Sequence, residues 1–130
     1  PIPSLATAPD AVRERLIEGG PISLEARTAR QQRVLDDATN QVAGTSDRTP
    51  LNPDWDQRFL AQLRAFDFDA IEALDDDAIT RDGGCGGHEI RTWLAAAAAA
   101  RSVGVTTFDL RYYRAIPEWI AGYGVMTASN

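Results

Sequence analysis

The chain has 130 residues, 19 acidic against 13 basic side chains, and a formal net charge of −6. This size predicts one soluble domain or part of one, and no apolar run approaches the roughly 20 residues of a membrane-spanning helix. An acidic surface repels phosphate backbones, so we expect neither nucleic acid nor a membrane as a partner.

The chain has one cysteine and one histidine, which limits the kinds of site it can build alone. Cys85 has no second cysteine for an intrachain disulfide, which fits a reducing compartment, and we expect a cytoplasmic protein. His88 is the one histidine, so the chain alone cannot build a site that needs two. The sequence begins Pro-Ile-Pro without an initiator Met or the basic start of a signal peptide. We therefore expect a processed chain or a piece of something longer.

The first elements predicted along the chain are helices. After an extended arrival over residues 1–5, Thr7 caps a short helix over residues 8–18, and Ser23 caps a longer one to about residue 42. The apolar stripe of the longer helix is thin, which indicates a surface helix. Its polar residues 30–33 favour a solvated face, although they could instead face another subunit.

The middle of the chain predicts further helices. Asn52 and Pro53 form a start signal, and the stripe that follows indicates a core made by Trp55, Phe59, Leu60 and Leu63. A short helix is predicted over residues 67–74. Three aspartates at residues 75–77 then cap a turn through Thr80. They could hold a metal, but the helix dipole alone favours acidic residues there, and we prefer that interpretation.

The most unusual stretch is the glycine loop, which we define as residues 83–87, with four glycines in five positions. Glycine weakens regular structure and is used where the chain turns tightly or approaches another group closely. A helix is predicted from about residue 87 to 102, and its alanine run at residues 95–100 suggests that it is buried. A strand over residues 103–113 and then a turn and a short strand complete the chain.

Three features could carry chemistry. Glu89, in the first turn of a helix behind the glycine loop, is a candidate ligand, or an ordinary first-turn carboxylate. His88 cannot share an ion with Glu89, because neighbours on a helix point about 100° apart. We interpret it as a supporting residue or a hydrogen-bonding residue at the helix start. The glycine loop lacks the Lys-Ser/Thr pair of a phosphate-binding loop, which ranks phosphate binding low.

Four motifs together resemble the class III (LigB-like) extradiol ring-cleaving dioxygenases over essentially all 130 residues. They are residues 30–34 (Arg-Gln-Gln-Arg-Val), 50–56 (Pro-Leu-Asn-Pro-Asp-Trp-Asp), 88–93 (His-Glu-Ile-Arg-Thr-Trp) and 111–122 (Arg-Tyr-Tyr-Arg-Ala-Ile-Pro-Glu-Trp-Ile-Ala-Gly). The last motif is long and specific. The second would be weak by itself.

The resemblance implies that residues 1–130 are the C-terminal part of a single catalytic domain about twice this long. The parent fold would be a three-layer α/β fold, of which this chain is a mostly helical segment with one or two terminal strands. The implied cofactor is Fe(II), held by two upstream histidines and by Glu89, with His88 at most a neighbour of the ligand. The catalytic histidines of the family lie upstream of Pro1. The chain alone would then be inactive.

The resemblance further implies a catechol that carries a propionate side chain, with O2 as the second substrate, and a homo-oligomer is expected. The substrate carboxylate needs a cationic or hydrogen-bonding partner, and Arg91, Arg111 and Arg114 are candidates by type alone. Two alternatives stay open. One is a related enzyme that acts on another catechol, such as protocatechuate or gallate. The other is a non-catalytic helical subunit, which should not expose a large apolar patch.

Overall fold

The structure, a computed structural model, describes residues 9–19 and 21–130 and is mostly helical in this part. Its elements are α1 (Asp10–Glu18), α2 (Leu24–Ala43), α3 (Pro53–Ala65), α4 (Phe68–Glu72), α5 (Asp76–Gly83), η1 (Cys85–Glu89), α6 (Ile90–Ser102), β1 (Thr107–Ile116), η2 (Pro117–Trp119) and β2 (Ala121–Ser129). The predicted helical segment with two terminal strands is therefore confirmed. No helix of the described residues is both long and apolar enough to cross a bilayer.

Three predicted helix starts are confirmed by side-chain caps. The backbone N–H of Ala26 donates to Ser23 Oγ at the start of α2, and that of Trp55 donates to Asn52 Oδ1 at the start of α3. Asp75 accepts from the N–H of Ala78 in the same way. Each cap satisfies one of the amide groups that a helix start leaves without a partner. The predicted cap Thr7 and the extended residues 1–5 lie outside the described residues.

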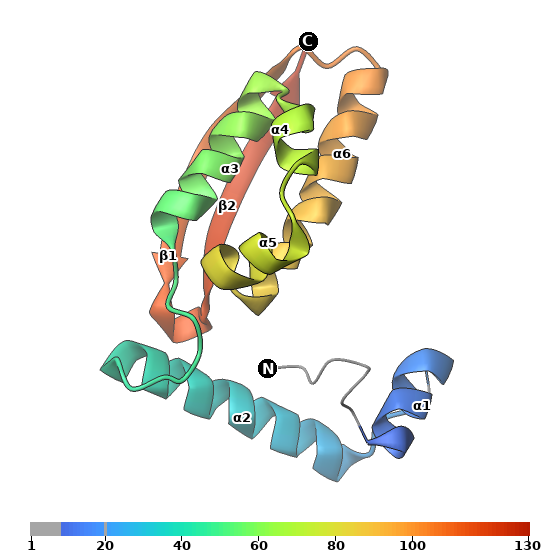
Figure 1. Ribbon diagram of the computed structural model, residues 1–130, viewed down its shortest axis with the longest axis vertical. Helices are drawn as coiled ribbons and strands as arrows, with labels where there is room; N and C mark the ends of the chain where they lie inside the picture. Colours follow the sequence, from blue (N-terminus) through green and yellow to red (C-terminus); the bar gives the residue numbers. More distant parts are fainter. Residues whose placement is uncertain (1–8, 20) are drawn as a thin grey trace.

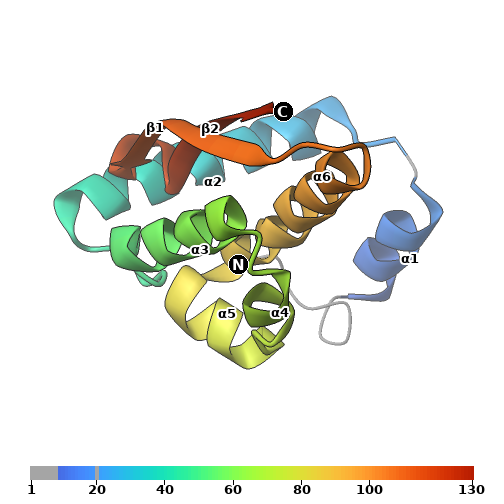
Figure 2. The same ribbon diagram turned by 90° about the horizontal axis from the view of Figure 1, so that it is seen from above.

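The main body has three layers (Figures 1 and 2). The β1–β2 hairpin forms one side, α3 and α6 lie against it, and α4 and α5 lie on the far side of these two helices. The core sits between the layers. Its buried side chains are Trp55, Phe59, Leu60, Leu63, Ile71, Ile79, Ile90, Ala97 and Phe108. The core stripe predicted for α3 is thus confirmed.

The hairpin differs from the predicted strands in its bounds. β1 pairs antiparallel with β2 from Thr107↔Ser129 to Ile116↔Ala121, with a bulge at Arg111. The strand does not begin at Val103, because Val103 ends α6 and Gly104 turns the chain with a φ of 96°. It runs past Tyr113 because pairing with β2 supplies hydrogen-bond partners there. β2 is accordingly a full strand and not the short one predicted.

The expectation that α6 is buried is wrong for this chain. Among the described residues of α6 only Ile90 and Ala97 are buried, while four alanines of the run are exposed: Ala95, Ala96, Ala98 and Ala99. Small side chains permit close packing, but the exposure of these alanines shows that the described residues leave part of the surface of α6 uncovered. Composition alone does not tell how many faces of a helix are covered.

The α2 helix is a surface helix, as predicted, and residues 30–33 are exposed. Among the described residues it has no buried side chain, and it touches the body near η2 (Figure 1). Its apolar stripe is open, with Leu24, Val34, Leu35 and Val42 between 46% and 73% exposed. The outward face of the hairpin likewise exposes Tyr112, Tyr123 and Val125. This chain therefore leaves considerable apolar surface uncovered.

Candidate functional site

The Glu89 carboxylate lies where η1 meets α6. Glu89 is the last residue of η1 and occupies the cap position of α6, with φ −65° and ψ −17°. Its backbone carbonyl accepts a hydrogen bond from Thr92 Oγ1 at 2.7 Å. The prediction that the helix begins at about Gly87 is wrong by one turn, because the glycine-rich segment closes first as a tighter 3-10 helix.

The side chain of Glu89 is exposed. Within residues 9–19 and 21–130 its carboxylate accepts no hydrogen bond and forms no ion pair. The N-terminus of α6 lies beside it and favours a negative charge. An exposed carboxylate without a partner, at a helix start, has its oxygens available to a ligand from outside this chain.

His88 faces the preceding helix instead of sharing a site with Glu89. Its Nε2 lies 2.8 Å from Thr80 Oγ1 of α5, and the residue is partly buried. This contact joins η1 to α5 and fixes the orientation of the imidazole ring. The structure thus places His88 beside Glu89 in the chain, with its own polar contact to α5.

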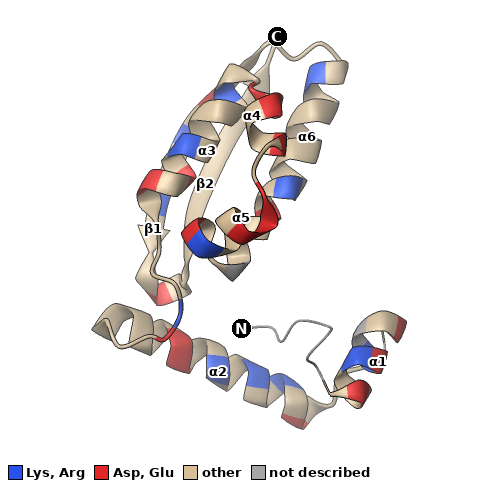
Figure 3. Cartoon of the chain, viewed as in Figure 1, with Lys and Arg blue, Asp and Glu red and all other residues tan. Residues whose placement is uncertain are grey.

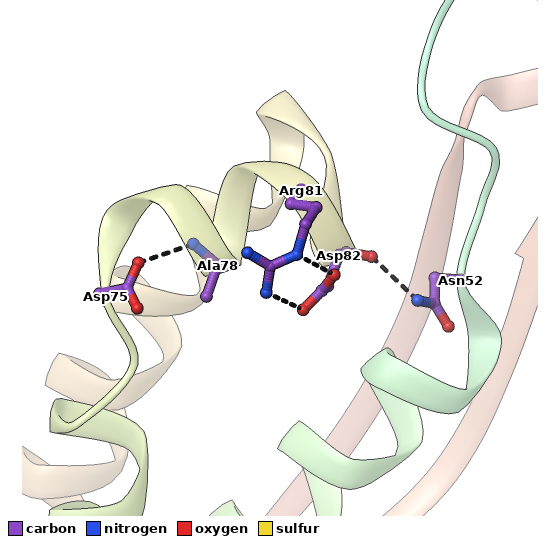
Figure 4. Close-up of polar contacts among 5 residues, drawn as sticks. All are labelled: Asn52, Asp75, Ala78, Arg81 and Asp82. Carbon is purple, nitrogen blue, oxygen red and sulfur yellow. Dashed lines mark hydrogen bonds and ion pairs between the residues drawn. The ribbon is translucent and has the colours of Figure 1, made fainter.

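The three aspartates at residues 75–77 serve α5. Asp75 caps the helix with a hydrogen bond of 2.8 Å, and Asp76 forms an ion pair with Arg91 of α6 (Figure 4 shows Asp75). Acidic residues gather along α4, α5 and the segment between them (Figure 3). The capping interpretation is confirmed for Asp75.

A complete metal centre is not assembled in the part of the chain that the structure describes. Residues 9–19 and 21–130 contain no group of three His, Cys, Asp or Glu side chains that could hold an ion. A 2-His-1-carboxylate site needs three such ligands. Within the described residues, such a set of three ligands is not brought together.

The arginines proposed for a substrate carboxylate differ in their contacts. Arg91 is paired with Asp76, and Arg111 donates to Thr127 Oγ1 at 3.0 Å and lies 3.4 Å from Asp109. Within the described residues, Arg114 is exposed and makes no hydrogen bond or ion pair. Of the three, Arg114 has the guanidinium most available to another molecule.

An open apolar groove of about 420 Å³ lies between α3, α6 and the hairpin. Its lining includes Thr92, Trp93 and Ala96, which continue along α6 from Glu89. The other residues that line it are Leu63, Ala97, Ala100, Phe108, Met126, Thr127 and Ala128. Trp93 and Ala96 lie on the helix face that the i+4 and i+7 spacing from Glu89 predicts.

A polar pair that the sequence analysis missed joins α3 to β1. Tyr113 Oη donates to Asp56 Oδ2 at 2.6 Å. Burial raises the pKa of the Asp56 carboxyl, and the hydrogen bond from Tyr113 opposes this rise. Burial also raises the pKa of Tyr113 well above its ordinary value, and the hydrogen bond to Asp56 and the charge of Asp56 act in the same direction. Both residues lie in the motifs that carried the resemblance.

The Tyr113–Asp56 pair predicts an alkaline limit to stability. The folded-state pKa of Tyr113 lies above its unfolded value, so the stabilisation is full below the unfolded pKa of about 10 and is lost as the pH rises toward the folded pKa. Tyr113→Phe should flatten the fall in the free energy of unfolding above about pH 10, measured by urea denaturation across that range. The exposed Tyr112→Phe is the control and should keep the wild-type slope. If the free energy of unfolding falls with pH equally steeply in Tyr113→Phe and the wild type, Tyr113 is not the group that causes the fall.

Comparisons with known proteins find one matching family and several relatives that share one name. The LigB family, described as the catalytic LigB subunit of aromatic ring-opening dioxygenase, matches residues 26–125. Proteins named 2,3-dihydroxyphenylpropionate/2,3-dihydroxicinnamic acid 1,2-dioxygenase are similar to 98% of this chain. Identity is 50% for the relative from Cupriavidus pinatubonensis, 49% for that from Burkholderia vietnamiensis and 43% for that from Mycolicibacterium paratuberculosis. The chain spans 41%, 40% and 41% of their respective lengths.

Proposed function

The chain belongs to the LigB family of aromatic ring-opening dioxygenases, and we propose that it is the C-terminal part of the single catalytic domain of an extradiol dioxygenase. The observation that carries the proposal is the family match over residues 26–125, which includes Glu89. The parent would be a three-layer α/β fold, cytoplasmic and homo-oligomeric. The open stripe of α2, the outward hairpin face and the open groove support a segment that is covered by more protein.

We infer that the substrate is 3-(2,3-dihydroxyphenyl)propionate or its cinnamate analogue, as the names of the relatives suggest. The reaction breaks the ring carbon–carbon bond beside the hydroxylated carbons and places both atoms of O2 in the product, a 2-hydroxy-6-oxo-dienedioate. No external reductant is consumed, because the catechol itself supplies the electrons. Such an enzyme serves the degradation of 3-phenylpropionate and related aromatic compounds.

The proposed cofactor is Fe(II). Two histidines from outside this chain would complete its set of protein ligands. When bound, the iron acts as a Lewis acid that lowers the pKa of the catechol hydroxyls and brings the catechol and O2 together. Glu89, at the start of α6, would contribute one anionic ligand. His88 keeps η1 joined to α5 through Thr80 and is at most a neighbour of the ligand.

The available guanidinium of Arg114 favours it over Arg91 and Arg111 as a partner for the substrate carboxylate. A different catechol would leave these roles unchanged and alter only the residues that contact the side chain of the substrate. A helical subunit without catalysis is the other candidate. The apolar surface left open by this chain favours the enzyme segment over a self-sufficient subunit.

The test is oxygen uptake by the chain alone and by the complete polypeptide, each loaded anaerobically with Fe(II). We expect the complete polypeptide to consume one O2 per 2,3-dihydroxyphenylpropionate and to form the ring-opened dienoate, seen by its absorbance. The chain alone should show no uptake. Turnover of protocatechuate or gallate in place of the phenylpropionate would change the substrate assignment. Failure of the iron-loaded complete polypeptide to open any catechol would favour the structural subunit.

A further inference from the structure

The glycine loop is in close contact with a side chain from α3. A Cβ built on Gly83 would lie 2.8 Å from Cη2 and Cζ3 of Trp55 and 3.0 Å from its Cζ2. A Cβ on Gly87 would lie 3.4 Å from Cη2 of the same ring and 3.1 Å from Ile79 Cγ2. Side chains do not come within 3.0 Å of each other without a shift, so the outer ring of Trp55 occupies the space of a side chain at position 83.

The ring of Trp55 is held firmly where it meets the loop. Trp55 is 7% exposed, and its ring stacks on Phe59 one turn further along α3, with 6.3 Å between ring centroids. A buried aromatic side chain that packs on its own helix has little freedom to move aside. The contact surface that α3 offers to Gly83 and Gly87 is therefore rigid.

A second contact from the start of α3 reaches the same segment. Asn52 Nδ2 donates to the carbonyl oxygen of Asp82 at 3.0 Å, immediately before Gly83 (Figure 4). The Oδ1 atom of the same amide accepts from the N–H of Trp55. One side chain therefore caps α3 and joins it to the end of α5.

The glycines of the loop are not equivalent. Nothing lies within 4 Å of a Cβ built on Gly86, and its φ lies outside the left-handed region. Glycine is thus required by close approach at position 83, whereas a Cβ at position 87 would be crowded mainly by Ile79 of α5 and a Cβ at position 86 would have open space. Gly87 precedes Glu89 by two residues, so the contact with Trp55 is made next to the proposed ligand.

We propose that Trp55 and Asn52 are positioning residues for Glu89, because together they clamp the glycine loop from which η1 carries the carboxylate. The inference rests on the proposed function, in which Glu89 is a ligand to iron. The clamp fixes the position of the glycine loop relative to α3. The loop in turn fixes where α6 begins. Loss of the clamp should displace Glu89 without unfolding the core.

The experiment uses the complete polypeptide, variants of the loop contact and a control variant. Gly83→Ala inserts a methyl group against the Trp55 ring, and Trp55→Phe on that background removes the outer ring that it would strike. Gly86→Ala is the matched control. Two quantities are measured: the amide hydrogen exchange of residues 84–90 without metal, and the Kd for Fe(II) under anaerobic conditions.

We expect Gly83→Ala to speed exchange in residues 84–90 and to weaken Fe(II) binding about 10- to 100-fold, as loss of outer support for a ligand does. Gly86→Ala should leave the exchange rates and the Fe(II) affinity unchanged. The double variant, Gly83→Ala with Trp55→Phe, should recover most of the wild-type exchange protection and Fe(II) affinity. Asn52→Asp keeps a good helix cap but loses the N–H that reaches Asp82, so it should weaken Fe(II) binding in the same direction. Urea denaturation and circular dichroism are used to check that each variant is folded.

Equal exchange and equal Fe(II) affinity for folded Gly83→Ala and Gly86→Ala would overturn the clamp. So would a double variant no better than Gly83→Ala. If exchange follows the prediction but wild type and Glu89→Gln bind Fe(II) equally, the proposed function fails and the contact is only structural, which overturns the positioning role. The exchange measurement, made without metal, separates these two failures.

Discussion

Replacing Glu89 by glutamine is expected to weaken Fe(II) binding by the complete polypeptide by more than the roughly 10- to 100-fold that loss of an outer supporting residue costs. Glutamine keeps the size of the side chain and its place at the start of α6. It removes the negative charge that a divalent cation prefers in an oxygen ligand. The affinity is measured anaerobically by competition with a chromogenic Fe(II) chelator.

Glu118→Gln is the matched control for this prediction. Glu118 is an exposed glutamate on η2, outside the region of α5, η1 and α6. Its replacement changes the net charge equally and should leave the Fe(II) affinity as it is. Equal affinities for Glu89→Gln and Glu118→Gln would contradict the assignment of Glu89 as a ligand.

The largest loss of stability is expected for Leu63→Ala. Leu63 is a fully buried side chain of α3, at 2% exposure, and it lines the groove between α3, α6 and the hairpin. Removing its branched end forfeits the transfer free energy and leaves a cavity, at a cost of about 2–5 kcal/mol. Urea denaturation of the same polypeptide measures the change.

Val103→Ala provides the comparison, since Val103 at the end of α6 is 78% exposed and lies outside the apolar surfaces proposed to be covered by more protein. An exposed truncation is expected to change the free energy of unfolding by no more than about 0.5 kcal/mol. A change at Leu63 as small as that at Val103 would show that the core around Leu63 does not hold the protein together.

Helix starts were predictable because their signals are local. Ser23, Asn52 and Asp75 each cap a helix that begins at the next residue, and each bonds an amide three residues on. The core stripe of α3 follows equally directly from its spacing. These features depend on residues within one or two turns of the chain, which a sequence displays.

Features that depend on distant contacts were missed or wrong. The burial of α6 was overestimated because an alanine run does not reveal which of its faces meet other elements. The bounds of β1 were wrong because they depend on pairing with β2, up to 22 residues away at Thr107↔Ser129. Asp56 and Tyr113 are 57 residues apart, and no pattern joins them in the sequence.

In the candidate site, too, features set by nearby residues were predictable and features set by distant contacts were not. Glu89 and His88 are candidates from the sequence itself and the resemblance supplies their roles toward a metal, which remain predictions. Trp55 and Asn52 were recognised only as a core residue and a helix cap. Their contacts with the glycine loop, such as that from Asn52 to Asp82 across 30 residues, appear only once the chain is folded. The composition of the glycine loop indicates that another group approaches it closely. It does not indicate which side chain that is.

The number of iron ligands that this chain supplies is the most direct test of the proposed function. Anaerobic calorimetric titration with Fe(II) of the chain alone, and of the chain mixed with the remaining part of the polypeptide, measures this. We predict tight binding, with one iron per pair of parts, only in the mixture. Tight binding by the chain alone would contradict the single-carboxylate assignment, and the absence of binding in a correctly reassembled mixture would contradict the proposed iron enzyme.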